Sequence, residues 1–202
     1  MQNFVEKLKE KLQKPLPGLA AQMKMSAPTR GIHYDIPEDV KKSAVLLLLF
    51  PFEGRIRLPL IKRPDYGGVH SGQMALPGGK IEEGDISLMH TALRETHEEI
   101  GVKISPENVL GKLTDLYVPP SNSLVSPYIA FIEQRPTYRL AHNEVAKLIE
   151  SSIEHLQHPL TFAQKEISIQ QFKLKVPAFV VEEEIVWGAT AMIISEFLEI
   201  IK

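Results

Sequence analysis

Three glutamates lie within about one helical turn in the segment Arg94-Glu95-Thr96-His97-Glu98-Glu99-Ile100-Gly101. Spacings of three and four residues place Glu95, Glu98 and Glu99 on neighbouring positions of one helix surface. Carboxylates this close repel one another unless a cation lies among them, and a hard divalent cation bound through oxygen is the usual remedy. The spacing therefore predicts a metal-binding helix face, and an acidic face exposed to solvent is the alternative interpretation.

A glycine-rich turn, Pro77-Gly78-Gly79, comes before this helix. Glycine allows a tight turn and lets a ligand approach the backbone closely. Asp85 is the expected N-cap of the helix, and Gly101 is the expected left-handed stop. Arg94 adds a cation beside the carboxylates. The side of the helix that should pack against a sheet carries Ile86, Met89, Leu93, Thr96 and Ile100.

The turn and the helix together resemble the motif of the Nudix hydrolases. That motif reads Gly, five residues, Glu, seven residues, then Arg-Glu-apolar-x-Glu-Glu-x-Gly-apolar. Here Gly79 is followed after five residues by Asp85, and after eight more by Arg94. Asp85 replaces Glu, Thr96 takes the apolar position, and the second spacer is one residue longer. The longer spacer is similar to that of the coenzyme A pyrophosphatase branch.

The resemblance implies an α+β fold, namely an α/β/α sandwich with a mixed β-sheet, and residues 78–102 as the Nudix box. It also implies hydrolysis of a nucleoside diphosphate linked to another group, with Mg²⁺ or Mn²⁺ as cofactor. Glu95, Glu98 and Glu99 are then the expected metal ligands, and Arg94 orients them by ion pairing. Gly78 and Gly79 are expected to shape the substrate-binding loop. The base is Glu95, Glu144 or another late carboxylate, and we take Glu95, Glu98, Arg94 and Glu144 as the catalytic candidates.

A second motif of the coenzyme A branch lies just ahead of the box. The chain is similar to it at Leu60, Arg63, Gly72, Pro77, Gly78 and Gly79. It departs where Gly68 occupies the position of a second arginine, which would be a natural clamp for phosphate. Arg63 and His70 are the candidates for binding the substrate phosphates in its place, with Lys62 as a further cation.

This resemblance ranks the substrates. Coenzyme A or an acyl-CoA, cleaved to 3′,5′-ADP and (acyl-)phosphopantetheine, comes first. ADP-ribose or a nucleoside-diphosphate sugar comes second, and another nucleotide comes third. A non-catalytic module that binds a nucleotide as a sensor is the alternative from a different class.

Composition limits the other classes of function. The chain has 202 residues, 44% of them hydrophobic, with a net charge of −2 and no cysteine. This favours a single domain over residues 1–202 and no nucleic-acid partner. No apolar run approaches the ~20 residues of a membrane span, so we expect no membrane partner and a cytoplasmic location.

The elements around the box follow from periodicity. We expect residues 1–40 to form an N-terminal helix (3–13) followed by an irregular covering arm (19–40), and a homodimer formed through this arm is left open. The unbroken apolar run 44–50 predicts a central strand covered on both faces. The other expected elements are strands at 55–63, 109–118 and 124–132, a short helix or strand end at 143–150, a hairpin of 167–174 with 176–181, and a buried helix at 192–201.

Overall fold

The structure is a computed structural model that describes residues 2–31, 34–68, 70–169 and 172–202. Its helices are α1 (Gln2–Leu12), α2 (Gly18–Gln22), α3 (Leu88–Ile100), α4 (Ile153–Gln157) and α5 (Gly188–Ile201), with 3₁₀ turns η1 (Met23–Met25), η2 (Pro106–Asn108), η3 (Pro119–Ser121) and η4 (Pro159–Thr161). Its strands are β1 (Lys41–Phe52), β2 (Arg55–Lys62), β3 (Met74–Ala75), β4 (Gly78–Lys80), β5 (Val109–Lys112), β6 (Leu116–Val118), β7 (Ser123–Phe131), β8 (Lys147–Ser152), β9 (Phe162–Ile169), β10 (Phe172–Val181) and β11 (Glu184–Val186).

Strand β1 is the centre of the main sheet, as its apolar run predicts. It pairs in parallel with β7 and antiparallel with β2 and β4. The strand order is β3-β2-β1-β7-β5, with β4 also on β1, β6 on β7 and β8 on β2. Strands β9, β10 and β11 form a second, three-stranded sheet. The predicted mixed sheet is confirmed.

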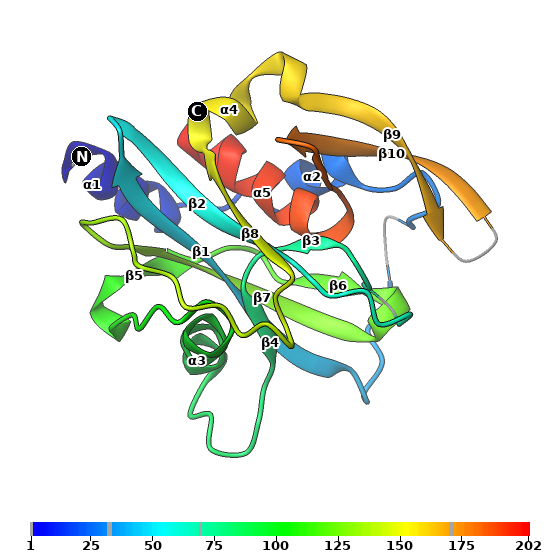
Figure 1. Cartoon of the computed structure of the whole chain (residues 1–202), viewed down its shortest axis with the longest axis horizontal. Coiled ribbons are helices and arrows are strands. Elements are labelled where there is room, and N and C mark those ends of the chain that lie inside the picture. Colours follow the sequence, from blue (N-terminus) through cyan, green and yellow to red (C-terminus); the bar gives the residue numbers. More distant parts are fainter. Residues whose placement is uncertain (1, 32–33, 69, 170–171) are drawn as a thin grey trace.

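Successive residues of β1 point to opposite faces of the sheet, and each face has its own apolar cluster. Leu46 and Leu48 pack in the cluster that contains Ala92 of α3. Leu47 and Leu49 belong to the cluster that contains Phe197 of α5. Figure 1 shows α3 on one side of the sheet and α1, α2 and α5 on the other. The α/β/α sandwich is therefore confirmed.

The N-terminal arm is tied to α5 by a buried glutamate. Glu196, which is fully buried, accepts hydrogen bonds from Gly18 N (3.2 Å) and Gln22 Nε2 (2.8 Å) of the arm. It also accepts one from Thr114 Oγ1 (2.6 Å), in the segment between β5 and β6. The arm thus packs against its own chain, and it contains α2 and η1 where only irregular structure was expected.

Two strand predictions are wrong in their boundaries. The predicted strand 109–118 is divided into β5 and β6, because each pairs with β7 in a different register: Lys112 lies opposite Tyr128, but Leu116 lies opposite Val125. Between the two ladders, the segment from β5 to β6 therefore has one residue more than the facing part of β7. The hairpin strands are β9 and β10, so the break predicted at residue 175 does not exist: Lys175 pairs with Glu166 inside the ladder.

The segment 143–150 joins the sheet later than expected, because its strand, β8, begins only at Lys147.

Among the described residues, no helix combines the length and the apolar character that a membrane crossing requires.

Candidate active site

Helix α3 begins two residues later than the sequence suggested. Its N-cap is Ser87, whose Oγ accepts a hydrogen bond from His90 N at 3.2 Å. The predictions of Asp85 as the cap and of Ile86 as a packing residue are therefore wrong, and Ile86 is 89% exposed. The extended backbone of Ser87 (φ −166°) separates Ile86 from the helix, so helical periodicity does not reach it. The predicted stop at Gly101 is confirmed by its φ of 74°.

Asp85 instead joins the loop before the helix to the middle of the helix. Its carboxylate accepts hydrogen bonds from Arg94 Nε (3.1 Å) and Nη2 (3.0 Å), from Thr91 Oγ1 (2.8 Å) and from Glu82 N (3.1 Å). The Arg94 guanidinium holds the pKa of Asp85 well below its usual range. In turn, Asp85 is the main cause of a raised Arg94 pKa. The sequence alone gave no sign of the Thr91 contact.

The three glutamates of the box are Glu95, Glu98 and Glu99. Arg94 contacts the first two of them. Its Nη1 lies 3.1 Å from Glu95 Oε1 and 2.7 Å from Glu98 Oε2. Its Nη2 donates to the Lys80 carbonyl at 3.0 Å. Arg94 therefore lies among the carboxylates, as expected, and connects α3 to the end of β4.

The third box glutamate, Glu99, is buried and only 3% exposed. Its Oε2 accepts a hydrogen bond from Gly78 N at 2.8 Å. Burial raises the pKa of Glu99 to about 7, against the opposing effects of this hydrogen bond and of the Arg63 charge. The charges of Glu95 and Glu144 act in the same direction as burial. The pKa of Glu95 is also raised, chiefly by burial.

The two glycines of the turn are required by close packing. A β-carbon at Gly79 would overlap the Glu95 carboxylate, 2.6 Å from Oε2. Gly78 has a φ of 152°, and a β-carbon there would lie 2.6 Å from Val45 Cα. In this structure the backbone N–H of Gly78 is used in its hydrogen bond to the Glu99 carboxylate.

The other predicted site residues divide into two groups. Arg63 lies at the site, since its Nη2 donates to the Gly78 carbonyl at 3.2 Å and its charge acts on Glu99. Glu144 lies close enough for its charge to act on Glu99 as well, and it remains exposed. By contrast, Lys62 forms an ion pair with Glu184 at 3.0 Å. His70 is bonded through Nδ1 to Gln73 Oε1 at 3.1 Å.

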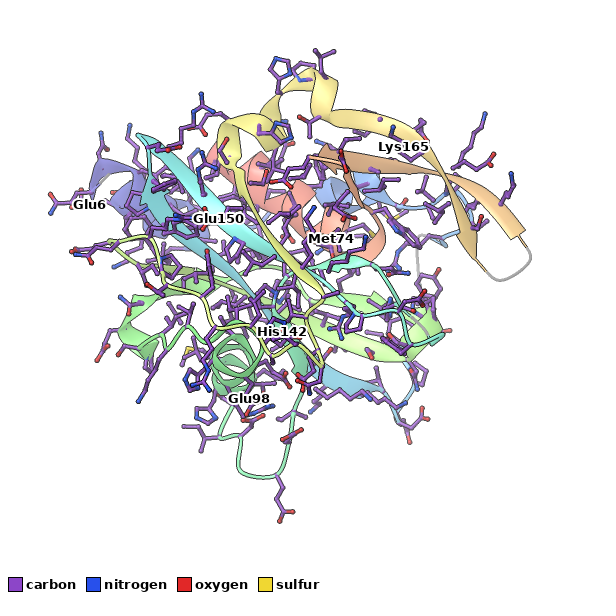
Figure 2. All side chains as sticks on the ribbon, viewed as in Figure 1. Glu6, Met74, Glu98, His142, Glu150 and Lys165 are labelled. Carbon is purple, nitrogen blue, oxygen red and sulfur yellow. The ribbon has the colours of Figure 1, made fainter. Side chains whose placement is uncertain are left out.

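The loop before β8 brings Glu144 to the helix. Ala141 N donates to the Glu99 carbonyl at 3.0 Å, and Arg139 N donates to the Ile100 carbonyl at 2.9 Å. Figure 2 labels Glu98 on α3 and His142 in the loop that leads to β8. These backbone contacts join segments that are distant in sequence, and no local pattern predicts them.

The carboxylate oxygens of Glu95, Glu98 and Glu99 are ligands of the kind that a hard divalent cation prefers. Burial raises the pKa values of the Glu95 and Glu99 carboxylates by more than the contacts with Arg94, Arg63 and the Gly78 amide lower them, so a further positive charge beside them would be favourable. Within the described part of the chain, however, no three acidic or histidine side chains converge into a ready metal site. Arg94 Nη1 lies instead between Glu95 and Glu98.

Comparison with known proteins gives the same family as the box. The NUDIX domain family model matches residues 40–170. A protein named "Uncharacterized Nudix hydrolase NudL", from Yersinia enterocolitica, is 34% identical over 137 residues, which cover 68% of this chain and 70% of that protein.

Solved structures show the same fold. A MutT/nudix family protein from Enterococcus faecalis aligns with a TM-score of 0.57 and 19% identity, over 84% of this chain and 65% of that one, which is less than two thirds of its length. The NUDIX domain of Shewanella oneidensis NrtR, solved with ADP ribose, aligns with a TM-score of 0.50 and 21% identity, over 63% of this chain and 84% of that one.

Proposed function

Since this chain belongs to the Nudix hydrolase family, which acts on phosphoanhydride bonds, we propose that it cleaves the diphosphate of coenzyme A or an acyl-CoA. The products are 3′,5′-ADP and phosphopantetheine or its acyl derivative. Water adds to one phosphorus of the diphosphate, and the bond between that phosphorus and the bridging oxygen breaks. The observation that carries the proposal is the set of Glu95 and Glu99 carboxylates packed against the Gly78–Gly79 turn, with Arg94 bonded to Glu95 and Glu98.

Glu95, Glu98 and Glu99 would hold Mg²⁺ or Mn²⁺. When bound, such an ion neutralises phosphate charge, polarises the P–O bond and makes a water more acidic. The protein's own contribution is to fix the acids. Arg94 holds Glu95 and Glu98, and the Gly78 amide holds Glu99.

Arg63 is the cation best placed for a substrate phosphate, because its guanidinium lies against the Gly78 carbonyl and close to Glu99. A guanidinium offers several donors and needs only one for that carbonyl. Lys62 is less suited, since it is ion-paired with Glu184. We assign Glu144 as the candidate base that takes the proton of the attacking water, because it is an exposed carboxylate close enough to Glu99 for its charge to act there.

Hydrolysis of ADP-ribose or a nucleoside-diphosphate sugar is the second candidate. It is favoured by Gly68, which occupies the position where the coenzyme A motif has a second arginine. The wider proposal, that the substrate is a small nucleoside-diphosphate derivative, is shared by both candidates.

The test is turnover of the purified full chain with Mg²⁺ or Mn²⁺. Coenzyme A, acetyl-CoA, ADP-ribose, NADH and a dinucleoside polyphosphate are compared by kcat/KM. We expect coenzyme A or its thioester to give the highest value. A higher value for ADP-ribose would replace the first candidate by the second, and no turnover of any of them with either metal would leave the sensor interpretation.

The assigned acids are tested by Glu98→Gln. The Glu98 side chain is 51% exposed, so the amide should leave the fold unchanged. We expect turnover to fall by at least about 100-fold, because a carboxylate ligand is lost. Glu154→Gln on α4, an exposed glutamate on another element, is the matched control and should keep wild-type turnover. Wild-type rates in Glu98→Gln would refute the assignment.

A further inference from the structure

Two threonines of α3 are fully buried, and their hydroxyls have different partners. Thr96 Oγ1 donates to the Ala92 carbonyl at 2.7 Å, one turn back in the same helix. This is the usual partner of a threonine inside a helix. Thr91 Oγ1 lies 3.3 Å from the corresponding carbonyl, that of Ser87, but 2.8 Å from Asp85 Oδ2. Because a hydroxyl has one proton, that proton goes to the nearer and charged acceptor, which lies outside the helix.

Asp85 needs such partners, because its side chain is only 2% exposed. A buried carboxylate has to be held by hydrogen bonds. Its other partners in the described part of the chain are the long side chain of Arg94, the Glu82 amide of the same loop, and His90, whose side chain is 46% exposed. Thr91 is thus the short, buried side chain that ties Asp85 to the helix.

The Arg94 guanidinium passes the position of Asp85 on to the acids. A guanidinium holds its N–H donors in one rigid plane. Nε and Nη2 of Arg94 donate to Asp85, and Nη2 also donates to the Lys80 carbonyl. Nη1, at another corner of the plane, contacts Glu95 and Glu98. A rotation of the Asp85 carboxylate would therefore turn the plane and move Nη1 relative to both glutamates.

The residues of this series of contacts lie along one side of α3. Arg94 and Glu95 come three and four residues after Thr91, and Glu98 comes four residues after Arg94. Such spacings place side chains next to one another on a helix surface. Thr91 is therefore the first position of the face that carries these two acids.

We propose that Thr91 is a positioning residue for the metal-binding acids. Its hydroxyl fixes the Asp85 carboxylate, which sets the plane of the Arg94 guanidinium. That plane in turn fixes Glu95 and Glu98, two of the acids assigned to Mg²⁺ or Mn²⁺. The inference rests on the proposed function, because only that function assigns an ion to these acids.

The test measures Mn²⁺ binding to the purified full chain by calorimetry, which needs no turnover. Thr91→Val replaces the hydroxyl by a methyl group. We expect this variant to bind Mn²⁺ about tenfold more weakly, the lower end of the usual effect of a residue that holds a metal ligand indirectly. Thr91→Ser keeps the hydroxyl and should restore wild-type binding. Unchanged Mn²⁺ affinity in Thr91→Val would refute the proposal.

Thr96→Val is the matched control, because it also removes the hydroxyl of a fully buried threonine from the same helix. The bond lost there lies within the helix, so its loss can lower stability but should not change metal affinity. Urea unfolding in EDTA measures the stability of both variants. Equal weakening of Mn²⁺ binding in Thr91→Val and Thr96→Val would mean that Thr91 has a structural role only.

Arg94→Lys tests whether the effect passes through Arg94. Lysine keeps the charge but lacks the planar fork, so it cannot pass the orientation of Asp85 on to the acids. We expect Arg94→Lys to weaken Mn²⁺ binding by itself. The double variant with Thr91→Val should bind Mn²⁺ no more weakly than Arg94→Lys alone, because both changes break the same series of contacts. Losses that multiply would contradict this route.

A second measurement needs no metal. The Nε proton of Arg94 is bonded to the buried Asp85, so it should exchange slowly with water in NMR spectra of the metal-free wild-type chain. Thr91→Val should speed up this exchange, and Thr96→Val should not. Equal exchange in wild type and Thr91→Val would rule out a positioning role. If the wild-type chain binds no Mn²⁺, the proposed reaction fails, and the exchange rates still decide whether Thr91 positions Arg94.

Discussion

The three box glutamates differ strongly at the scale of single residues, although they have the same chemistry and lie within about one turn. The Glu98 side chain is half exposed, that of Glu95 is 13% exposed, and Glu99 is buried. Desolvation disfavours a charged carboxylate. The pKa is accordingly raised at Glu95 and Glu99, while Glu98 is held by Arg94 at the surface. Negative charge is therefore most costly at Glu99, beside the glycine turn.

Glu99 should make the stability of the metal-free protein depend on pH. Its pKa is about 7 in the folded chain and about 4.3 in an unfolded one. Between these values the folded state binds more protons, so this contribution is complete below about pH 4 and is lost as the pH rises through 7. Between pH 4 and pH 8, we expect Glu99 to lower the unfolding free energy of the wild-type chain by up to about 3 kcal/mol. The Glu99→Gln variant should not show this part of the decrease.

The measurement is urea unfolding in EDTA at several pH values. The quantity compared is the difference between wild type and Glu99→Gln, since Asp85, with its lowered pKa, acts in the opposite direction at lower pH. Glu154→Gln serves as the control again. Parallel stability curves for wild type and Glu99→Gln would show that burial does not affect Glu99 as described.

At the scale of elements, α3 and the preceding loop form one rigid unit. Ser87 caps the helix, Asp85 bonds to Arg94 and Thr91, and Arg94 bonds to the Lys80 carbonyl. At the other end Gly101 stops the helix, and a β-carbon there would lie 2.8 Å from the Arg139 carbonyl oxygen. The helix is thus fixed at both ends and braced in the middle, which keeps the acids in position.

Loss of the helix cap should cost stability more than it costs chemistry. Ser87→Ala leaves the His90 amide without its side-chain acceptor, and we expect the unfolding free energy to fall by about 1 kcal/mol. Ser87→Asp keeps an acceptor and should remain close to wild type. Chemical denaturation of the two variants measures this, and equal losses in both would mean that the cap bond contributes nothing.

At the scale of the whole molecule, segments outside the matched NUDIX region complete the sandwich. The family model ends at residue 170, but α5 covers one face of the sheet and the arm packs on α5. Glu196 holds α5, the arm and the segment after β5 together. These contacts are as expected if residues 1–202 fold as a single unit, which stays a prediction, as does the homodimer.

Removal of the Glu196 carboxylate should loosen the arm. Glu196→Ala leaves the buried Gln22 amide and the half-buried donors of Gly18 and Thr114 without this acceptor, so we expect a loss of about 3 kcal/mol. Hydrogen exchange should speed up in residues 14–26. Glu199→Ala, on the same helix but in exposed ion pairs with Lys24 and Lys202, should have little effect. Equal stability of the two variants would contradict the role of Glu196.

The sequence by itself determined the features that depend on local pattern. The apolar run of β1, the spacing of the box acids and the stop at Gly101 identified the central strand, the helix and the family, because periodicity of 2 or 3.6 residues is a local property. Even here the helix start was misplaced, since Ser87 competes with Asp85 as the cap.

Only the tertiary structure decided the environments. The burial of Glu99 and the approach of Glu144 and Arg63 depend on where the loops fold back against the sheet. Desolvation and charge interactions act through space, so residues far apart in the chain set them. For the same reason Lys62 and Arg63, adjacent in sequence, have different roles: one pairs with Glu184, and the other lies at the acids.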